Sequence, residues 1–359
     1  MTDQPVRVMV VDDSAVIRGA ITRILEKDSE IKVVASAGNG AAALAALPRL
    51  KPDIIILDIE MPVLDGLTAL PQILRAAPEA RVIMASTLTQ RGAEISLKAL
   101  SLGAIDVLPK PMAGAIFGAD DFARDLVQKV LALGRTRPSA RSALGPPQAQ
   151  AAAEGRVRLR AAGHEAASIV GIGASTGGPQ ALQAVLSGLP AAFQLPIVVV
   201  QHMPPTFTRL LAGELARVGR RPACEGQDEM PVERGHVYVA PGGNHMTVER
   251  RKDGTVLRLN RDPPENYCRP AVDPLFRSLA GAYGGGTLAV VLTGMGSDGA
   301  RGATTIAAAG GTVLAQDEAS SVVWGMPGAV AALGLCSALV PLSDMARRIG
   351  ELARMPVCP

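Results

Sequence analysis

The strongest constraint on the fold is an alternation of short apolar runs with longer helical patterns over residues 1–133. The apolar runs are VRVMVVDD, IKVVASAG, DIIILDIE, RVIMAST and AIDVLPKP. Between them lie segments such as AVIRGAITRILEKD and GAEISLKALSLG, which carry apolar residues at helical spacing. Because the short runs are apolar throughout, we expect strands that are buried on both faces. The alternation therefore predicts a parallel sheet that is covered by helices on both sides.

The same alternation returns after residue 167. The apolar runs there are SIVGIGAS, PIVVVQH, GHVYVAP, TLAVVLTG and GTVLAQD. The segment MTVERRKDGTVLRLNRD differs, since a DG pair between two extended runs predicts a β-hairpin. The expected fold class is α/β, with two doubly wound parallel-sheet domains: a flavodoxin-like first domain and a Rossmann-like second domain that carries the hairpin.

The two series are separated by a segment rich in proline, alanine, glutamine and arginine, RTRPSARSALGPPQAQAAAEGRVRLRAAGHEAA. We interpret residues 134–167 as an interdomain linker between a first domain over 1–133 and a second over 168–356. A surface loop within one domain is the alternative, but a structureless loop of this length is unusual in a compact fold. A chain of 359 residues is long enough to form two domains.

Composition and charge exclude several classes of protein. A net charge of +3 and an aromatic content of 3% give no electrostatic or stacking basis for nucleic-acid binding. The four cysteines form no CxxC pair, which fits a reducing compartment and no zinc site. The amino terminus MTDQPVRVMVVDDS lacks the apolar core of a secretory signal, and no apolar run reaches the length of a membrane span. We expect a cytoplasmic protein, without membrane insertion, that is a monomer.

Charged and hydroxyl side chains follow the predicted strands of the first domain. Asp12 and Asp13 end the first strand and Asp58 the third, while Ser86 follows the fourth and Lys110 the fifth. The carboxyl ends of parallel strands meet at one edge, so these groups should converge there. Converging carboxylates repel one another unless a cation neutralises them, and oxygen-only ligands suit Mg²⁺. The alternative for the aspartate pair alone is a solvated turn and helix cap.

The motifs VVDDS, LDIEMPVLDG, ASTLT and LPKP, in this order, resemble those of a response-regulator receiver domain. The resemblance implies that Asp58 accepts a phosphoryl group from a histidine kinase. It also implies that Asp12, Asp13, Asp58 and the backbone carbonyl of Glu60 hold Mg²⁺.

The same resemblance assigns Ser86 as the switch hydroxyl and Lys110 as the conserved lysine of receivers. One position departs from the family pattern. Many receivers have an aromatic residue three positions before the lysine, where this chain has Val107. An aromatic side chain therefore cannot report phosphorylation from that position.

The stretch GIGASTGGP, residues 171–179, opens the second domain and allows two interpretations. A dinucleotide-binding loop would have its third glycine where this chain has Thr176, and the next strand leads to glutamine and histidine instead of an acidic residue. The window around Ser175 fits the pattern G-x-S-x-G, in which small residues let a serine hydroxyl project above the sheet. A nucleophile turn is the better fit.

A serine nucleophile needs a base, and the chain has four histidines. His164 lies in the expected linker and His236 begins a strand. His202 directly follows the strand PIVVVQ, at the same sheet edge as Ser175, and His245 in APGGNHM is its main rival.

The base in turn needs a carboxylate that orients it. Asp298 follows a strongly apolar strand in TLAVVLTGMGSDGA, which favours it for this role. Asp273 stands at a predicted helix start, where capping is the ordinary explanation, and Asp317 follows another predicted strand. The order Ser…His…Asp differs from that of α/β-hydrolases and excludes that family.

Six motifs of the second domain together resemble the chemotaxis methylesterase family, CheB: GIGASTGGP, VVVQHMPPTFT, VYVAPGGNHM, RPAVDPLFRS, LTGMGSDGARG and QDEASSVVWGMPGAV. The resemblance implies a protein-glutamate methylesterase and glutamine deamidase that acts on methyl-accepting chemoreceptors without a cofactor in the esterase reaction. It assigns Ser175 as nucleophile, His202 as base and Asp298 as the orienting group. Thr176 and the Met295 backbone N–H would belong to the oxyanion and substrate region.

Two other functions stay open at the level of the sequence. The second domain could be a binding module without chemistry, or a nucleotide-dependent enzyme that uses the glycine loop. A Ser175→Ala substitution separates the three possibilities, since only a serine hydrolase loses its rate while it keeps its fold. The tandem arrangement also suggests a hypothesis in which the receiver restricts access to Ser175 until Asp58 is phosphorylated.

Overall fold

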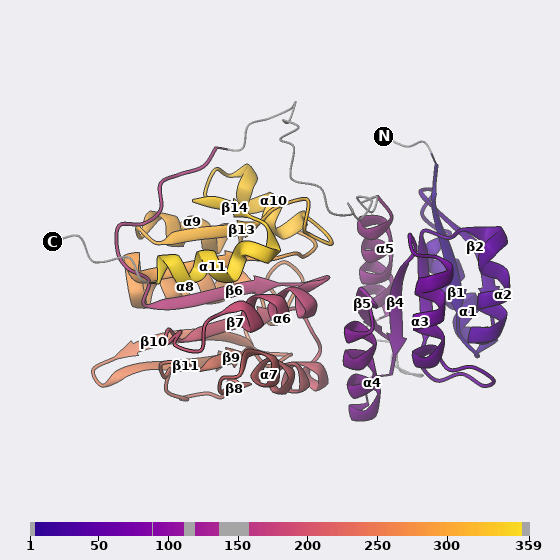
Figure 1. Ribbon diagram of the computed structural model, residues 1–359, viewed down its shortest axis with the longest axis horizontal. Coiled ribbons are helices and arrows are strands. Elements are labelled where there is room, and N and C mark those ends of the chain that lie inside the picture. Colours follow the sequence, from indigo (N-terminus) through magenta and orange to yellow (C-terminus); the bar gives the residue numbers. More distant parts are fainter. Residues whose placement is uncertain (1–3, 88, 111–118, 136–157, 354–359) are drawn as a thin grey trace. The chain divides into compact units, whose positions relative to one another are not determined.

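The computed structural model describes residues 4–87, 89–110, 119–135 and 158–353 (Figure 1). The chain divides into two compact units, residues 1–138 and 139–359. Most of the expected linker, residues 136–157, lies outside the described residues. Its last part, from Arg158, is hydrogen-bonded to the second unit: Arg160 N donates to Cys336 O, and Gly163 N donates to Thr312 Oγ1.

The first unit is a five-stranded parallel sheet with the strand order β2-β1-β3-β4-β5. The strands are β1 Val6–Val11, β2 Ile31–Ala37, β3 Ile54–Asp58, β4 Arg81–Ser86 and β5 Asp106–Pro109. The helices are α1 Ala15–Leu25, α2 Gly40–Leu50, α3 Gly66–Ala76, α4 Gln90–Ser101 and α5 Ala119–Arg135. Helices α1 and α5 contact each other on one face, while α2, α3 and α4 follow one another on the opposite face. The predicted doubly wound fold is confirmed.

Local sequence explains where these helices begin. Ser14, Asn39, Asp65 and Thr89 are N-caps whose side chains accept a hydrogen bond from a backbone N–H in the first helical turn. Each cap stands two to seven positions beyond the end of a strand. The caps therefore end the strand-to-helix loops at the edge where Asp12, Asp58 and Lys110 lie.

The second unit is built on a seven-stranded parallel sheet with the order β14-β13-β12-β6-β7-β9-β8. Its strands are β6 Ile169–Ala174, β7 Ile197–Gln201, β8 Ala223–Glu225, β9 Val237–Val239, β12 Thr287–Val291, β13 Thr312–Gln316 and β14 Ala338–Val340. The predicted hairpin is also present, as the antiparallel pair β10 His245–Arg251 and β11 Gly254–Asn260.

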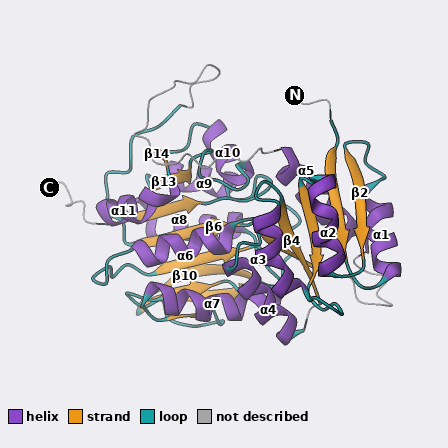
Figure 2. Ribbon diagram, turned by 45° about the vertical axis from the view of Figure 1, so that its right-hand side comes forward, coloured by secondary structure: helices purple, strands orange, loops and turns teal. Residues whose placement is uncertain are grey.

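Helices cover both faces of this sheet (Figures 1 and 2). The helices are α6 Gly178–Gly188, α7 Pro205–Gly219, α8 Val272–Tyr283, α9 Ala300–Ala308, α10 Gly325–Ala332 and α11 Leu342–Leu352, with a 3₁₀ turn η1 over Gly284–Gly286. One buried cluster joins α6, α7 and α11 to the sheet, and a second joins α8, α9, α10 and the hairpin to it. Every residue of β6, β7 and β12 is buried, as the uniformly apolar runs predict.

The order of the strands in this sheet indicates where a functional site is expected. The strands that follow β6 in the chain, β7, β8 and β9, lie on one side of it in the sheet. The later strands β12, β13 and β14 lie on its other side. The order therefore reverses between β6 and β12. In open parallel sheets, ligands bind outside the carboxyl ends of the strands at such a reversal.

No helix in the described ranges is both long enough and apolar enough to cross a membrane.

Candidate active site

Ser175 and His202 lie one residue beyond the paired ends of two neighbouring strands. In the parallel register of β6 and β7, Ala174 is opposite Gln201. The backbone N–H of His202 donates to Ala174 O at 3.1 Å, which fixes the two exits beside each other. On the other flank, the Ser175 backbone N–H donates to Thr293 O at 3.0 Å, just after β12. The serine therefore stands at the reversal point of the sheet.

The turn after Ser175 depends on glycines. Gly177, the N-cap of α6, has φ +76°, a backbone conformation that residues with a side chain rarely adopt. A Cβ on Gly178 would lie 2.0 Å from Gln201 Oε1. The amide of Gln201 donates in turn to Ser175 O at 2.9 Å. These contacts bring the start of α6 against the end of β7 and hold the serine backbone in a tight turn.

His202 and Asp298 form a close pair. The distance between His202 Nε2 and Asp298 Oδ2 is 2.8 Å, and the side chains are 12% and 2% exposed. Because a carboxylate only accepts hydrogen bonds, Nε2 carries the proton of the neutral ring. Nδ1 is then the basic nitrogen. The residues are 96 positions apart in the chain, and the sheet brings them together.

Four further donors surround the carboxylate of Asp298. They are the backbone N–H groups of Val272 (2.6 Å), Asp273 (3.1 Å) and Gly299 (2.9 Å), and the side-chain amide of Asn266 (2.9 Å). Two of these groups belong to the first turn of α8, where the helix dipole favours a negative charge. Burial opposes ionisation, but the hydrogen bond from His202 and the backbone donors outweigh it and hold the pKa of Asp298 below its ordinary value.

The environment of His202 changes its pKa in the opposite direction. Burial lowers the pKa of the imidazole, but Cys268 and Asp298 outweigh burial and raise it above the ordinary value of 6.5. The contact with Cys268 is a feature that the sequence did not predict: its Sγ lies 3.4 Å from His202 Nδ1. A charged ring is stabilised between the carboxylate on one side and the sulfur on the other.

The first unit carries a second charged cluster. The ammonium of Lys110 lies 2.6 Å from Asp12 Oδ2 and 2.6 Å from Asp58 Oδ1. Carboxylate oxygens of Asp12, Asp13 and Asp58 lie within 4.8 Å of one another. Asp12 and Asp58 are buried, and Asp13 is exposed. Burial raises the pKa of Asp58 while Lys110 opposes the rise. One lysine does not balance three carboxylates, so the cluster has the ligands and the charge that a divalent cation requires.

Ser86, also predicted at this edge, is 1% exposed. Its hydroxyl lies 3.2 Å from both Gly92 O and Thr87 O, at the start of α4. In this structure the hydroxyl is thus engaged with the backbone of α4. Val107, at the position of the receiver aromatic, is buried in β5.

Comparison with known proteins connects these two clusters to one family. The model for CheB methylesterases matches residues 170–349, and the model for response-regulator receiver domains matches residues 8–116. A protein-glutamate methylesterase/protein-glutamine glutaminase from Rhodospirillum rubrum is 55% identical, over 95% of this chain and 94% of its own length. The corresponding protein of Azospirillum brasilense is 53% identical over 97% of this chain.

The chain belongs to the CheB methylesterase family. A solved structure agrees with this assignment. The catalytic domain of the Thermotoga maritima CheB methylesterase is 40% identical, with a TM-score of 0.51, and matches 52% of this chain and all of that domain. The first unit is accordingly a receiver domain, and the second is a methylesterase domain.

The two residues predicted for the oxyanion region lie near Ser175 in the methylesterase domain: Thr176 follows it directly, and Met295 follows Gly294, which approaches the Ser175 side chain. Thr176 is 2% exposed, and its carbonyl accepts a hydrogen bond from Thr293 Oγ1 at 3.0 Å. Met295 is half-buried in a loop whose Gly294 approaches the Ser175 side chain. Within the described part of the chain, the Met295 backbone N–H has no hydrogen-bond acceptor, so it is available to a substrate oxygen.

The rival histidine, His245, has a structural position. It is 1% exposed, its Nδ1 accepts from Ala271 N at 3.2 Å, and its Nε2 lies 3.2 Å from Pro263 O. Both ring nitrogens are thus used to hold the segment before α8. His236 is partly exposed and pairs with Glu233.

The rival aspartates are structural as well. Asp273 is fully buried and accepts from Gly302 N at 2.7 Å, so it satisfies the first turn of α9 and does not cap its own helix. The backbone N–H groups of Val272 and Asp273, at the N-terminus of α8, donate to the carboxylate of Asp298 instead. Asp317 accepts from the backbone N–H of Ser320 at 3.1 Å, beyond β13.

The glycines before Ser175 pack against a helix, away from the turn. A Cβ on Gly171 would lie 2.4 Å from Leu279, and one on Gly173 would lie 2.6 Å from Val272, both in α8. Their absent side chains let α8 approach β6 and carry its N-terminus to Asp298. Only Gly177 and Gly178 shape the turn itself, so room around Ser175 explains just part of the glycine pattern.

A Gly173→Ala substitution is therefore expected to destabilise the methylesterase domain by about 1–3 kcal/mol, because the new methyl group overlaps the branched side chain of Val272. Urea unfolding of the full chain measures the effect. Gly213→Ala is the matched control, since a Cβ there meets nothing within 4 Å in α7 and alanine favours the helix by about 0.5–1 kcal/mol. Equal effects of the two substitutions would contradict this account of the glycines.

Proposed function

We propose that this chain hydrolyses glutamyl methyl esters, and deamidates glutamines, on the cytoplasmic helices of methyl-accepting chemoreceptors by a Ser175–His202–Asp298 mechanism. The observation that carries the proposal is the Asp298–His202 pair, which leaves Nδ1 as the base at the sheet edge where Ser175 also lies. Family membership supports the reaction type.

In the proposed reaction, His202 Nδ1 takes the proton of the Ser175 hydroxyl as the oxygen attacks the ester carbonyl. Asp298 holds the ring and stabilises its positive charge. The Met295 backbone N–H would donate a hydrogen bond to the developing oxyanion, and Thr176 would belong to the same region. Each such donor contributes roughly 10²-fold to the rate in comparable enzymes. The protonated ring then gives its proton to the departing methanol, or to ammonia from an amide. Water, activated by the same nitrogen, releases the glutamate.

The proposed steps use side chains and backbone groups of the chain together with water. Each hydrolysed ester restores a negative charge to a receptor helix, and like charges at neighbouring positions repel. This change in charge balance is a physical route from the esterase reaction to adaptation of a receptor's signal.

The receiver domain is proposed to regulate this reaction. Asp58 would accept a phosphoryl group from a chemotaxis histidine kinase, and Asp12, Asp13, Asp58 and the Glu60 carbonyl would hold Mg²⁺. The ion, when bound, would neutralise the carboxylates and stabilise charge on the phosphoryl oxygens. Lys110, already paired with Asp58, would contact a remaining phosphoryl oxygen, and Ser86 would rotate from α4 to contact another.

Methanol release from methylated receptor membranes tests the regulation. A small phosphodonor with Mg²⁺ is expected to stimulate release by the intact chain, whereas Asp58→Asn should keep the basal rate and lose the stimulation, because amide nitrogen does not accept the phosphoryl group. Removal of residues 1–133 is expected to raise activity toward receptors. Stimulation that persists in Asp58→Asn would refute the assignment of Asp58, and an unchanged or lower rate after removal would refute inhibition by the receiver.

A further inference from the structure

Cys268 contacts the proposed catalytic base, yet the esterase reaction does not use it. Its Sγ lies 3.4 Å from His202 Nδ1, within reach of an S–H···N hydrogen bond. Asp298 holds Nε2–H on the opposite side of the ring at 2.8 Å. In the neutral ring Nδ1 is therefore the acceptor, and the thiol is its donor. A thiol, an imidazole and a carboxylate stand in the order that activates a cysteine nucleophile.

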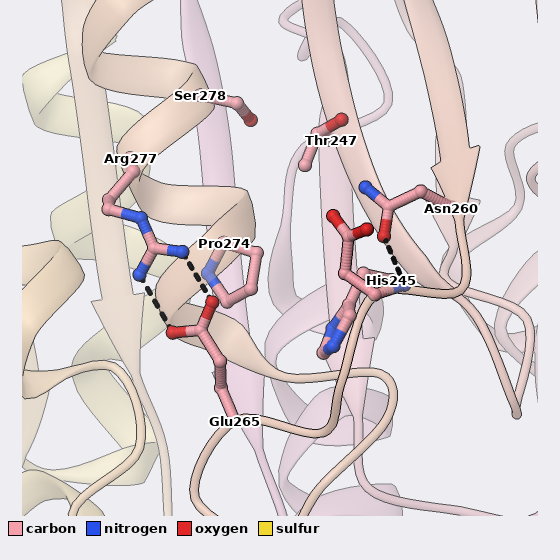
Figure 3. A pocket seen from close by; sticks show the side chains of 8 residues that line it. His245, Thr247, Asn260, Glu265, Pro274, Arg277 and Ser278 are labelled. Carbon is pink, nitrogen blue, oxygen red and sulfur yellow. Dashed lines mark hydrogen bonds and ion pairs between the residues drawn. The ribbon is translucent and has the colours of Figure 1, made fainter.

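A hydrogen-bonded turn holds the Cys268 thiol beside His202. Residues 265–268 close a tight turn in which Cys268 N donates to Glu265 O at 2.8 Å and the two central residues have positive φ. Asn266, the first of them, donates to both Asp298 and Asp273. Glu265 is anchored to α8 by a two-pronged ion pair with Arg277 (Figure 3). The turn that supports Asp298 thus also fixes Cys268 on His202.

The other described cysteines lack such a neighbour. Cys224 is partly exposed, as Cys268 is, but among the described residues the one hydrogen-bond partner of its Sγ is Met230 Sδ at 3.9 Å, and burial raises its thiol pKa. Cys336 is fully buried, which raises its pKa to about 12. A raised pKa disfavours the reactive thiolate. Cys224 is therefore a natural comparison for Cys268, with similar access and no base.

We propose that Cys268 is a reversible thiol-modification site that uses His202 as its base and captures small disulfides. In this step the thiol proton moves to His202 Nδ1, and the thiolate attacks one sulfur of R–S–S–R. A Cys268–S–S–R bond forms as the reagent's S–S bond breaks, and the departing thiolate takes the proton from His202 to give RSH. The cysteine is oxidised, and half of the disulfide is reduced.

The modification would switch the esterase off, an extension that rests on the proposed function. In the proposed mechanism Ser175 would need the nitrogen that Cys268 contacts, His202 Nδ1. A group attached to Cys268 would occupy the space beside that nitrogen and separate it from the serine or the ester. Reduction by a thiol would restore the enzyme.

The labelling test uses the full chain and bis(2-hydroxyethyl) disulfide at neutral pH, with adducts at each cysteine followed by peptide mass spectrometry. Cys268 is expected to react at least about tenfold faster than Cys224. His202→Gln, which removes the base, should slow Cys268 to the rate of Cys224. Equal rates in the intact chain, or an unchanged Cys268 rate in His202→Gln, would overturn the proposal.

The activity test follows methanol release during the same treatment. Release should fall in step with occupancy of Cys268 and return with dithiothreitol. The Cys224→Ser chain should respond in the same way, while Cys268→Ala should show equal rates before and after the reagent. Full occupancy of Cys268 with an unchanged rate would refute the inhibition. Since labelling needs no receptor substrate, failure of the esterase function would leave the labelling result interpretable.

Discussion

Replacement of Ser175 by alanine is expected to lower methanol release from methylated receptors by about 10⁴-fold or more, because the variant lacks the oxygen that would form the acyl-enzyme. The hydroxyl makes no hydrogen bond with another side chain in the described part of the chain, so the fold should survive its loss. Initial rates at saturating receptor measure the effect.

Circular dichroism and the thermal midpoint of the same samples are the controls for folding. A folded Ser175→Ala chain that keeps receptor binding but loses hydrolysis agrees with a serine hydrolase. A folded variant with near-normal hydrolysis would exclude Ser175 as the nucleophile. Loss of nucleotide affinity in place of hydrolysis would favour the cofactor interpretation of the glycine loop.

An Asp298→Asn substitution is expected to lower the rate by about 10³–10⁴-fold. An amide can donate to Nε2, which favours the tautomer with its proton on Nδ1, the nitrogen that has to accept the proton of Ser175. Rates at saturating receptor measure the loss. Asp317→Asn is the matched control, because this aspartate also follows a strand end, but within the described residues its carboxylate accepts hydrogen bonds from Ser320 of its own loop alone. This variant should keep the intact rate.

The pH profile gives the same variant a second readout. The base acts only when neutral, so activity falls as pH drops through the pKa of His202. That pKa is raised, which places the acid limb of the intact chain above pH 6.5. In Asp298→Asn the carboxylate charge is gone, so the residual activity should have its limb at lower pH. An acid limb at the same pH in both chains would show that Asp298 does not raise the pKa of His202.

The general layout of the site could be predicted from sequence because strand ends follow a simple rule. Apolar runs that end in GAS and VVQH place Ser175 and His202 at one edge, and the register of β6 and β7 agrees. The same rule predicted the convergence of Asp12, Asp58 and Lys110. In both cases the parallel sheet turns positions far apart in sequence into neighbours.

The residues that contact His202 and Asp298 could not be predicted from the sequence. Asn266 and Cys268 lie in an irregular segment between the hairpin and α8, where no periodicity indicates which way a side chain points. Asp273 and Asp298 each follow a plausible capping pattern. Only the packed structure reveals that Asp298 receives the N-terminus of α8 and that Asp273 receives that of α9.

The most direct test of the central claim identifies the residue that carries a fluorophosphonate once methanol release by the intact chain has been fully inactivated. Peptide mass spectrometry locates the adduct. One adduct is expected, on Ser175, and none in a folded His202→Gln chain treated for the same time, because the serine then has no base. Inactivation with Ser175 unmodified, or with the adduct on another residue such as Cys268, would contradict it.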